Sequence, residues 1–226
     1  MPAFAFEMPL WLVLSISAVV CYLLGCFNGA VIVSKYILRD DVRNHGSGNA
    51  GLTNFYRTFG GPLTGVVILT DVLKAVAAVL ISRWLMLHGF TIFISAASTT
   101  AFYDTVAKYW AGVFCLLGHM FPVMFKFKGG KGILSGGTIA LMMDWRVALV
   151  VWGGFLILSI ATKYVSLGSC WAGLSFPFVS WFVYHSLLIL VLAIICGGLI
   201  LWQHRGNINR LIHGTESKFH FHKKAK

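Results

Sequence analysis

The polar residues of this chain are concentrated in three glycine-containing segments that lie between long apolar runs. The first segment, residues 38–61, reads DVRNHGSGNAGLTNFYR at residues 41–57. Glycine lets the backbone turn its N–H groups toward a ligand, hydroxyl and amide side chains donate to oxygens, and arginine supplies positive charge. The segment therefore predicts a phosphate-binding loop, although its arginines could instead bind lipid headgroups. The candidate phosphate ligands are Arg43, Ser47, Gly48, Asn49, Thr53, Asn54 and Arg57.

The second segment places a histidine before a proline and a lysine among glycines, reading GHMFP at residues 118–122 and FKGGKG at residues 127–132. It is not a nucleotide-binding P-loop, because Gly132 follows the lysine where that motif needs Ser or Thr. Lys131 at the start of a predicted helix still suits an anion, since free N–H groups and the helix dipole attract negative charge there. His119 is either a packing residue or a site residue. The added phosphate-ligand candidates are Gly129, Gly130, Lys131 and Gly132.

The third segment follows the last apolar run and reads WQHRGNINRLIHGTE at residues 202–216. His204 and Asn207 are three residues apart, so a helix that continued from the apolar run would present both on one face. Lysines beyond residue 216 are typical of binding to anionic lipid. Within an earlier apolar run, Asp71 and Lys74 are also three apart, and ionisable groups at that depth are costly unless paired. They predict an internal ion pair rather than a direct substrate contact.

Metal or redox chemistry is not indicated by the sequence. The five cysteines all fall in apolar runs, and none has the C-x-x-C spacing of a zinc or redox site. His220 and His222 resemble a fragment of a metal site, but two ligands on a polar tail are more often solvated. We predict neither a metal nor a cofactor.

The elements that must position these segments are membrane-spanning helices. The chain has 226 residues, of which 58% are hydrophobic and 11% are charged, and a spanning helix takes about 20 apolar residues. We predict a single all-α integral membrane domain over residues 1–226, with seven transmembrane helices. An extra feature is expected at residues 90–109: an elongated third helix, a re-entrant hairpin or an outer amphipathic segment. The predicted spans cover residues 9–37, 62–86, a third ending at 121, 133–143, 147–162, 169–184 and 187–202.

The basic residues predict the orientation of these helices. A net charge of +11 on a soluble chain would suggest nucleic acid as a partner, but here the charges follow the topology. All 18 Lys and Arg residues except Lys74, Arg83, Lys108 and Arg146 lie in loops or a tail that the seven-helix topology places on one side. The positive-inside rule makes that side cytoplasmic, with the N-terminus outside and the C-terminus in the cytoplasm. No nucleic-acid partner is expected.

Together the three segments resemble the acyl-phosphate-dependent glycerol-3-phosphate acyltransferases, the PlsY family. The resemblance covers nearly the whole chain and is carried by GSGNAGLTNFYR at residues 46–57, GHMFP at 118–122, GGKG at 129–132 and HRGNINRLIHGTE at 204–216. It implies an enzyme of the bacterial cytoplasmic (inner) membrane whose active site faces the cytoplasm. Such an enzyme transfers a fatty acyl group from acyl phosphate to the 1-hydroxyl of glycerol 3-phosphate, the first acylation step of phospholipid synthesis.

The products implied by the resemblance are lysophosphatidic acid and phosphate, and the implied partners are acyl phosphate, glycerol 3-phosphate and membrane lipids. The resemblance also implies that Arg57 and Lys131 hold phosphate groups. Cys26 and Leu134 depart from the usual family residues without removing any of these groups. The implied catalytic residues are Ser47, His119, Lys131, His204 and Asn207.

The chemistry leaves the proton acceptor open. An acyl phosphate is an activated mixed anhydride, so the site needs alignment and charge neutralisation rather than a covalent nucleophile. We favour the departing phosphate as acceptor of the hydroxyl proton, with His119 or His204 as the alternative base.

Two other functions were weighed. Acyltransferases with a His-x4-Asp motif are excluded, because none of the eight histidines has Asp five positions later. The remaining alternative is a transporter or channel for a phosphorylated or anionic solute, which needs polar groups through the membrane interior, and these are sparse here.

Overall fold

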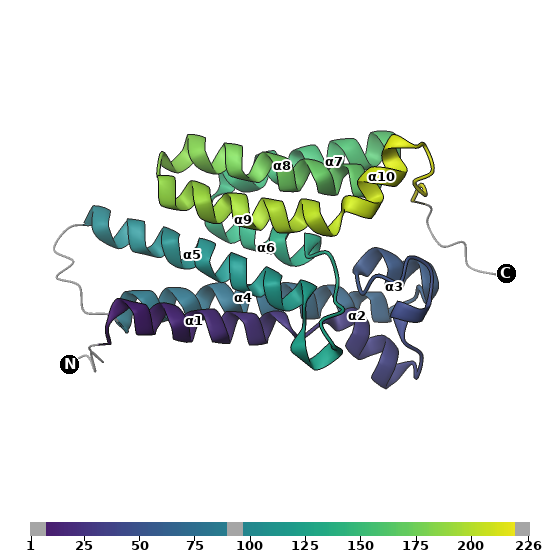
Figure 1. Ribbon diagram of the computed structural model, residues 1–226, viewed down its shortest axis with the longest axis horizontal. Coiled ribbons are helices and arrows are strands. Elements are labelled where there is room, and N and C mark those ends of the chain that lie inside the picture. Colours follow the sequence, from purple (N-terminus) through teal and green to yellow (C-terminus); the bar gives the residue numbers. More distant parts are fainter. Residues whose placement is uncertain (1–7, 90–96, 220–226) are drawn as a thin grey trace.

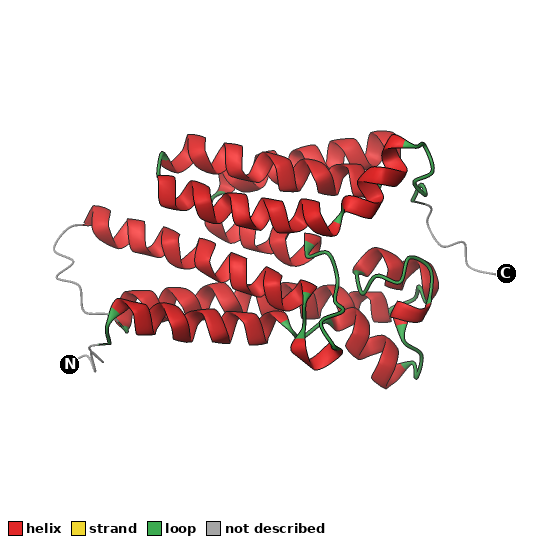
Figure 2. Cartoon of the chain, viewed as in Figure 1, coloured by secondary structure: helices red, strands yellow, loops and turns green. Residues whose placement is uncertain are grey.

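The computed structural model describes residues 8–89 and 97–219, and every regular element within them is helical (Figure 2). The predicted all-α class is therefore confirmed for this part of the chain. The basic tail after residue 219 and the pair His220 and His222 lie outside the described residues. The helices are α1 Leu10–Gly25, α2 Gly29–Ile32, α3 Leu52–Thr58, α4 Leu63–His88, α5 Ala97–Met120, α6 Ile133–Met143, α7 Trp145–Thr162, α8 Val165–Tyr184, α9 Leu187–Gln203 and α10 Arg205–Ile212, with short π or 3-10 turns at Val33–Ile37, Val42–Asn44 and Val123–Phe125.

The long helices form two groups that α6 joins (Figure 1). One group consists of α1, α4 and α5, which pack on one another, and the other consists of α7, α8 and α9. α6 packs against α4 and α5 on one side and α7 on the other, and α5 also contacts α9. Figure 1 shows α2, α3 and α10 at one end of the bundle, and the polar segments lie there with them.

The first predicted span is broken rather than continuous. α1 ends at Gly25, and after Asn28 the chain resumes as α2 and the π turn, bent by 40°. Asn28 causes the restart, because its side-chain oxygen accepts from the Val31 N–H at 3.1 Å and so caps the new helix. Its amide also donates to the Ala50 carbonyl at 3.0 Å. The break therefore attaches the first polar segment to the bundle.

The third span is one long helix over its described part, and the three alternatives expected for residues 90–109 stay open because part of that stretch lies outside the described residues. α5 runs without interruption from Ala97 to Met120, while residues 90–96 lie outside the described residues. Its acidic residue Asp104 pairs with Arg83 of α4 and, at 2.8 Å, with Lys108. These pairs explain how an apolar helix carries charges.

The surface is that of a membrane protein. Large apolar side chains are exposed along the helices of the second group, for example Leu149, Ile157 and Phe182, and water would not tolerate so much exposed apolar surface. Within the described residues, three helical stretches are long and apolar enough to cross a membrane: Leu63–His88, Ser98–Phe125 and Trp145–Thr162. Two bent pairs, α1 with Gly29–Ile37 and α9 with α10, raise the number to five if each counts as one span. The number seven stays a prediction.

Candidate active site

The three polar segments meet around one large cavity at the α3 and α10 end of the bundle. Its empty volume is about 2630 Å³, including space open to solvent. The lining contains the cations Arg57, Lys131, Arg205 and Arg210 and the acids Asp71 and Glu216. Eleven predicted site residues also line it: Ser47, Gly48, Asn49, Thr53, Asn54, Arg57, His119, Lys131, Gly132, His204 and Asn207. An anionic substrate would therefore meet an excess of positive charge.

Lys131 is held by a chain of hydrogen bonds that leads to the end of the third segment. Its ammonium donates to the side-chain oxygen of Asn207, and the Asn207 amide donates to the Glu216 carboxylate at 2.7 Å. Arg210 donates to the other carboxylate oxygen at 2.7 Å. Burial, with the positive charge of Arg210, lowers the pKa of Lys131 to about 8. Sequence reasoning missed Glu216 as a cavity residue, although it is the one acidic residue of the third motif.

Arg57 joins the first segment to the residues after α10. Its guanidinium donates to the Ser217 hydroxyl at 3.1 Å, to the Ser217 carbonyl at 3.3 Å and to the Lys218 carbonyl at 3.5 Å. All these partners are uncharged oxygens. A phosphate that enters the cavity offers stronger, charge-assisted acceptors to the same guanidinium.

Asn54 shapes the first loop from within. Its amide donates to the carbonyls of Val42, His45 and Asn49 at 3.0–3.1 Å, and its oxygen accepts from the Ser47 N–H at 3.1 Å. The buried side chain is thus used by the loop itself, which corrects its predicted role as a phosphate ligand.

The loop still presents free polar groups to the cavity. Within the described part of the chain, the side chains of Ser47, Asn49 and Thr53 make no hydrogen bond, and all three line the cavity. Gly48 adopts a φ of +69°, a left-handed conformation that favours glycine. All four residues line the cavity, and their role as phosphate ligands stays a prediction.

Arg43 does not line the cavity. Its guanidinium forms a bidentate pair with Asp41, at 2.7 Å from Nη2 to the carboxylate, and Nη1 donates to the carbonyls of Phe125 at 2.9 Å and Lys128 at 3.3 Å. Its predicted role as a phosphate ligand is corrected to one of tying the first segment to the second, because its donors are already occupied.

Gly129 and Gly130 also lie outside the cavity lining. Their N–H groups donate to the carbonyls of Met120 and His119, each at 3.1 Å, which satisfies carbonyls that the end of α5 leaves unpaired. A Cβ on either glycine would collide with this end of α5. Their predicted role as phosphate ligands is therefore corrected to capping α5, whereas Gly132, with a φ of +77°, lines the cavity at the start of α6.

A buried charged cluster forms the inner wall of the cavity. The Lys74 ammonium lies 2.7 Å from Asp71 Oδ1, as the sequence predicted for an internal ion pair. The same nitrogen lies 2.7 Å from His119 Nδ1 and 3.0 Å from the Phe27 carbonyl. His119 therefore lines the cavity and is anchored to the ion pair, which spacing along the chain does not reveal.

His204 lies at the bend between α9 and α10. The two helices meet at 59° rather than continuing as one, yet His204 and Asn207 both line the cavity. His204 is buried, and its Nδ1 lies 2.8 Å from the Ile200 carbonyl. After the bend, the third segment contributes His204, Arg205, Asn207 and Arg210 to the cavity lining.

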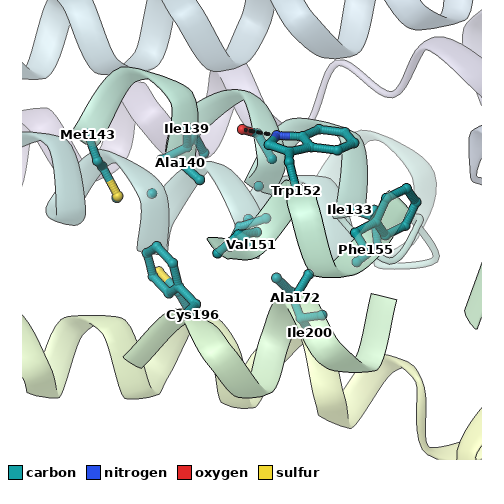
Figure 3. A pocket seen from close by; sticks show the side chains of 15 residues that line it. Ile133, Ile139, Ala140, Met143, Val151, Trp152, Phe155, Ala172, Cys196 and Ile200 are labelled. Atoms are coloured by element: carbon teal, nitrogen blue, oxygen red, sulfur yellow. Dashed lines mark hydrogen bonds between the residues drawn. The ribbon is translucent and has the colours of Figure 1, made fainter. Parts of the chain in front are cut away.

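A second cavity, which is apolar and lined by residues of α5, α6, α7, α8 and α9, adjoins the polar one. Its empty volume is about 490 Å³, a figure that includes space open to solvent, and apolar side chains and glycines line it (Figure 3). Ile133, Trp152 and Phe155 belong to the linings of both cavities. The Trp152 indole donates to the Gly137 carbonyl at 3.0 Å, which fixes the ring in the shared wall.

Comparison with known proteins agrees with this geometry. The family model described as glycerol-3-phosphate acyltransferase matches residues 15–214. A curated glycerol-3-phosphate acyltransferase of Thermoanaerobacter pseudethanolicus is 37% identical over 203 residues, covering 90% of this chain and 94% of the relative. Two crystal structures of PlsY (YgiH), an integral membrane glycerol 3-phosphate acyltransferase, are each 32% identical and cover 92% of this chain and 96% of theirs. The TM-score is 0.77 for the glycerol 3-phosphate form and 0.73 for the lysophosphatidic acid form. The chain belongs to the glycerol-3-phosphate acyltransferase (PlsY) family.

Proposed function

We propose that this enzyme transfers a fatty acyl group from acyl phosphate to the 1-hydroxyl of glycerol 3-phosphate, giving lysophosphatidic acid and phosphate. The observation that carries the proposal is the convergence of Arg57, Lys131 and Asn207 in one cationic cavity that shares a wall with an apolar cavity. One substrate class is anionic and polar, and the other is anionic with an apolar tail. The two adjoining cavities match this pair.

The proposed step is a direct transfer. The hydroxyl oxygen attacks the acyl carbonyl carbon, a C–O ester bond forms, and the bond from that carbon to the phosphate oxygen breaks. The hydroxyl proton goes to the departing phosphate, so inorganic phosphate leaves and atoms and charge balance. The step needs neither a metal nor a cofactor, because acyl phosphate is already activated and the protein supplies alignment and charge.

The site residues have separate parts in this step. Arg57 and Lys131 hold the phosphate groups, since paired cations neutralise charge that two substrates bring together. Ser47, with Asn49 and Thr53, offers free donors on the same wall. We assign catalysis to Ser47, His119, Lys131, His204 and Asn207.

The donor's tail occupies the apolar cavity in this proposal. Ile133, Trp152 and Phe155 border both cavities, so an acyl carbonyl at that boundary places the phosphate among the cations and the chain among α5, α6 and α9. Each buried methylene contributes about 0.8 kcal/mol, which gives these walls control of chain-length preference.

We further propose a single multi-pass domain over residues 1–226 in the bacterial inner membrane, with seven spans, the N-terminus outside and the cavity facing the cytoplasm. The support is the position of the basic residues: Lys128, Arg205 and Arg210 are at the cavity end of the bundle, and the positive-inside rule assigns that end to the cytoplasm. A transporter or channel is not favoured, because the family is one of acyltransferases.

The test is an assay of the purified protein with glycerol 3-phosphate and either palmitoyl phosphate or palmitoyl-CoA. We expect lysophosphatidic acid and one equivalent of phosphate from the first donor only. Lys131→Met is the matched inactive control, because it removes a cation without changing side-chain length greatly. Turnover with palmitoyl-CoA alone would overturn the proposed donor.

A further inference from the structure

The two buried histidines of the cavity are anchored through the same ring nitrogen by partners of opposite kind. His204 Nδ1 lies 2.8 Å from the Ile200 carbonyl oxygen, which can only accept a hydrogen bond. His119 Nδ1 lies 2.7 Å from the Lys74 nitrogen, and an ammonium can only donate. The first contact therefore places a proton on Nδ1 of His204, and the second leaves Nδ1 of His119 bare.

The Lys74 ammonium has three N–H protons, and three possible hydrogen-bond acceptors lie within reach of it in the described residues. Its three neighbours are Asp71 Oδ1 at 2.7 Å, His119 Nδ1 at 2.7 Å and the Phe27 carbonyl at 3.0 Å. The Asp71 carboxylate keeps the ammonium charged, since a buried carboxylate without a cation is strongly destabilising. Asp71 Oδ1 itself is 3.7 Å from His119 Nδ1, which is too long for a hydrogen bond.

The other ring nitrogen of each histidine is available to a ligand. Both residues line the polar cavity, and neither Nε2 atom makes a hydrogen bond within the described part of the chain. His119 Nε2 lies against Gly130, where a Cβ would collide with it. Only the absence of a side chain at residue 130 lets this nitrogen keep its position.

We infer that the two histidines are held in opposite neutral tautomers, so that His119 donates a hydrogen bond from Nε2 to an anionic substrate oxygen and His204 accepts one at Nε2 from the acceptor's hydroxyl. His119 then cannot serve as the general base, and Lys74 is the positioning residue that sets its tautomer. The identity of the substrate oxygens rests on the proposed function. The lone pair on His204 Nε2 accepts the hydrogen bond of the bound hydroxyl and so orients its oxygen before the transfer. As the transfer proceeds, this hydrogen bond breaks and the hydroxyl proton passes to the departing phosphate.

The tautomers can be read without substrate, which separates this inference from the proposed function. We would record nitrogen NMR shifts of protein labelled with ¹⁵N-histidine, assigning the signals by their loss in His119→Gln and His204→Gln. The expected pattern is a bare Nδ1 and protonated Nε2 in His119, and the reverse in His204. A protonated Nδ1 in His119 would show that Lys74 is a neutral amine and would overturn the inference.

The role of Lys74 is tested in the same spectra. Lys74→Met alone leaves Asp71 unpaired and endangers folding, so the variant to measure is Asp71→Asn with Lys74→Met. We expect the His119 signals to change to those of a mixture of tautomers while the His204 signals stay fixed. An unchanged His119 pattern would remove Lys74 from the positioning role.

Activity gives a second reading. His119→Gln keeps an N–H donor near the Nε2 position but cannot take a proton, whereas His119→Ala has neither function. We expect Gln to stay within about tenfold of wild type and Ala to lose about 100-fold or more, as when one preorganised donor is removed. His213→Gln is the matched control, since His213 is exposed and its ring contacts only the Asn209 carbonyl among the described residues. Equal losses in the Gln and Ala variants would assign His119 a role that a donor cannot fill.

Discussion

Lys131 and Asn207 are 76 residues apart in the chain, yet the Lys131 ammonium donates a hydrogen bond to the Asn207 side-chain oxygen. The contact joins the loop before α6 to α10, and Asn207 extends it to Glu216 at 2.7 Å. A half-buried cation is thereby kept in place by a neutral amide rather than by a direct ion pair. An incoming phosphate can replace the amide at lower cost than it could replace a carboxylate.

Catalytic efficiency should depend on the charge of Lys131. Its pKa is lowered to about 8, chiefly by burial, so the cation is fully present below that pH and is lost as the pH rises through it. Because kcat/KM reports the free enzyme, we expect kcat/KM for glycerol 3-phosphate to be level below pH 8 and to fall above it. Lys131→Arg should lack this fall, since a guanidinium stays charged. The same fall in the Arg variant would assign it to another group.

Arg57→Lys should lose activity although the charge is kept. The guanidinium donates from two nitrogens in the structure, and an ammonium cannot reproduce a bidentate contact with phosphate. We expect kcat/KM to fall at least about tenfold, or 1.4 kcal/mol, measured by initial rates at varied glycerol 3-phosphate. Lys218→Ala removes a nearby cation and should stay close to wild type. A loss of only a few-fold in Arg57→Lys would argue against bidentate binding.

Asn54→Ala should disorganise the first loop while leaving the bundle folded. The change removes three donated bonds and one accepted bond, and each buried group left unpaired costs about 1–3 kcal/mol. Faster hydrogen exchange at residues 42–49 and a raised KM for glycerol 3-phosphate are the expected results. Asn44→Ala is the control, because that exposed side chain makes no hydrogen bond within the described residues. Unchanged exchange in Asn54→Ala would contradict the loop-shaping role.

Gly136→Ala should shift donor preference toward shorter chains. Gly136 lines the apolar cavity, and a Cβ there would meet Leu116 and Ile200 at 3.5 Å, an ordinary contact that narrows the cavity without a clash. The helix itself gains about 0.5–1 kcal/mol from alanine. We would compare acyl phosphates of several lengths at fixed glycerol 3-phosphate. Gly198→Ala, in open space on α9, should leave the preference unaltered. An unchanged chain-length preference in Gly136→Ala, with a changed KM for glycerol 3-phosphate, would place the tail elsewhere.

The orientation can be tested by cysteine labelling in sealed vesicles. Cys170→Ser is the background, because Cys170 is half-buried while the other four cysteines are buried. A cysteine at the exposed residues Asn44 or Lys128 should react only from the cytoplasmic side, and one at Trp145 only from outside. Permeabilised vesicles give the total labelling for comparison. Labelling from outside at Asn44 or Lys128 would contradict the proposed orientation of the helices in the membrane.

The sequence alone determined the helical membrane architecture and the family of this protein. Its apolar runs are about long enough to cross a bilayer as helices. In lipid, only helices or closed barrels provide hydrogen bonds for all backbone N–H and C=O groups, and the length of these runs indicates helices. The motifs around Ser47, Lys131 and Asn207 identified the family, and all three motifs contribute residues to the cavity lining. Residue type is sufficient here, since glycines, cations and hydroxyls are the groups that phosphate requires.

Residue type does not show whether a group is already occupied. Asn54, Arg43 and the amide of Gly130 all suit a phosphate, but in the structure they are used by carbonyls and a carboxylate of the protein itself. The same limit applies to the break before Asn28, where a side chain from the bundle binds the Ala50 carbonyl. Such pairings join distant parts of the chain.

Only the tertiary structure decided how His119 and His204 differ. Both are histidines that follow apolar runs, and along the sequence either could be a base. Lys74 comes from α4 and lies beside Nδ1 of His119, whereas a carbonyl of α9 lies beside Nδ1 of His204. A histidine's tautomer depends on the partner that its other nitrogen meets, and in His119 that partner is 45 residues away in the chain.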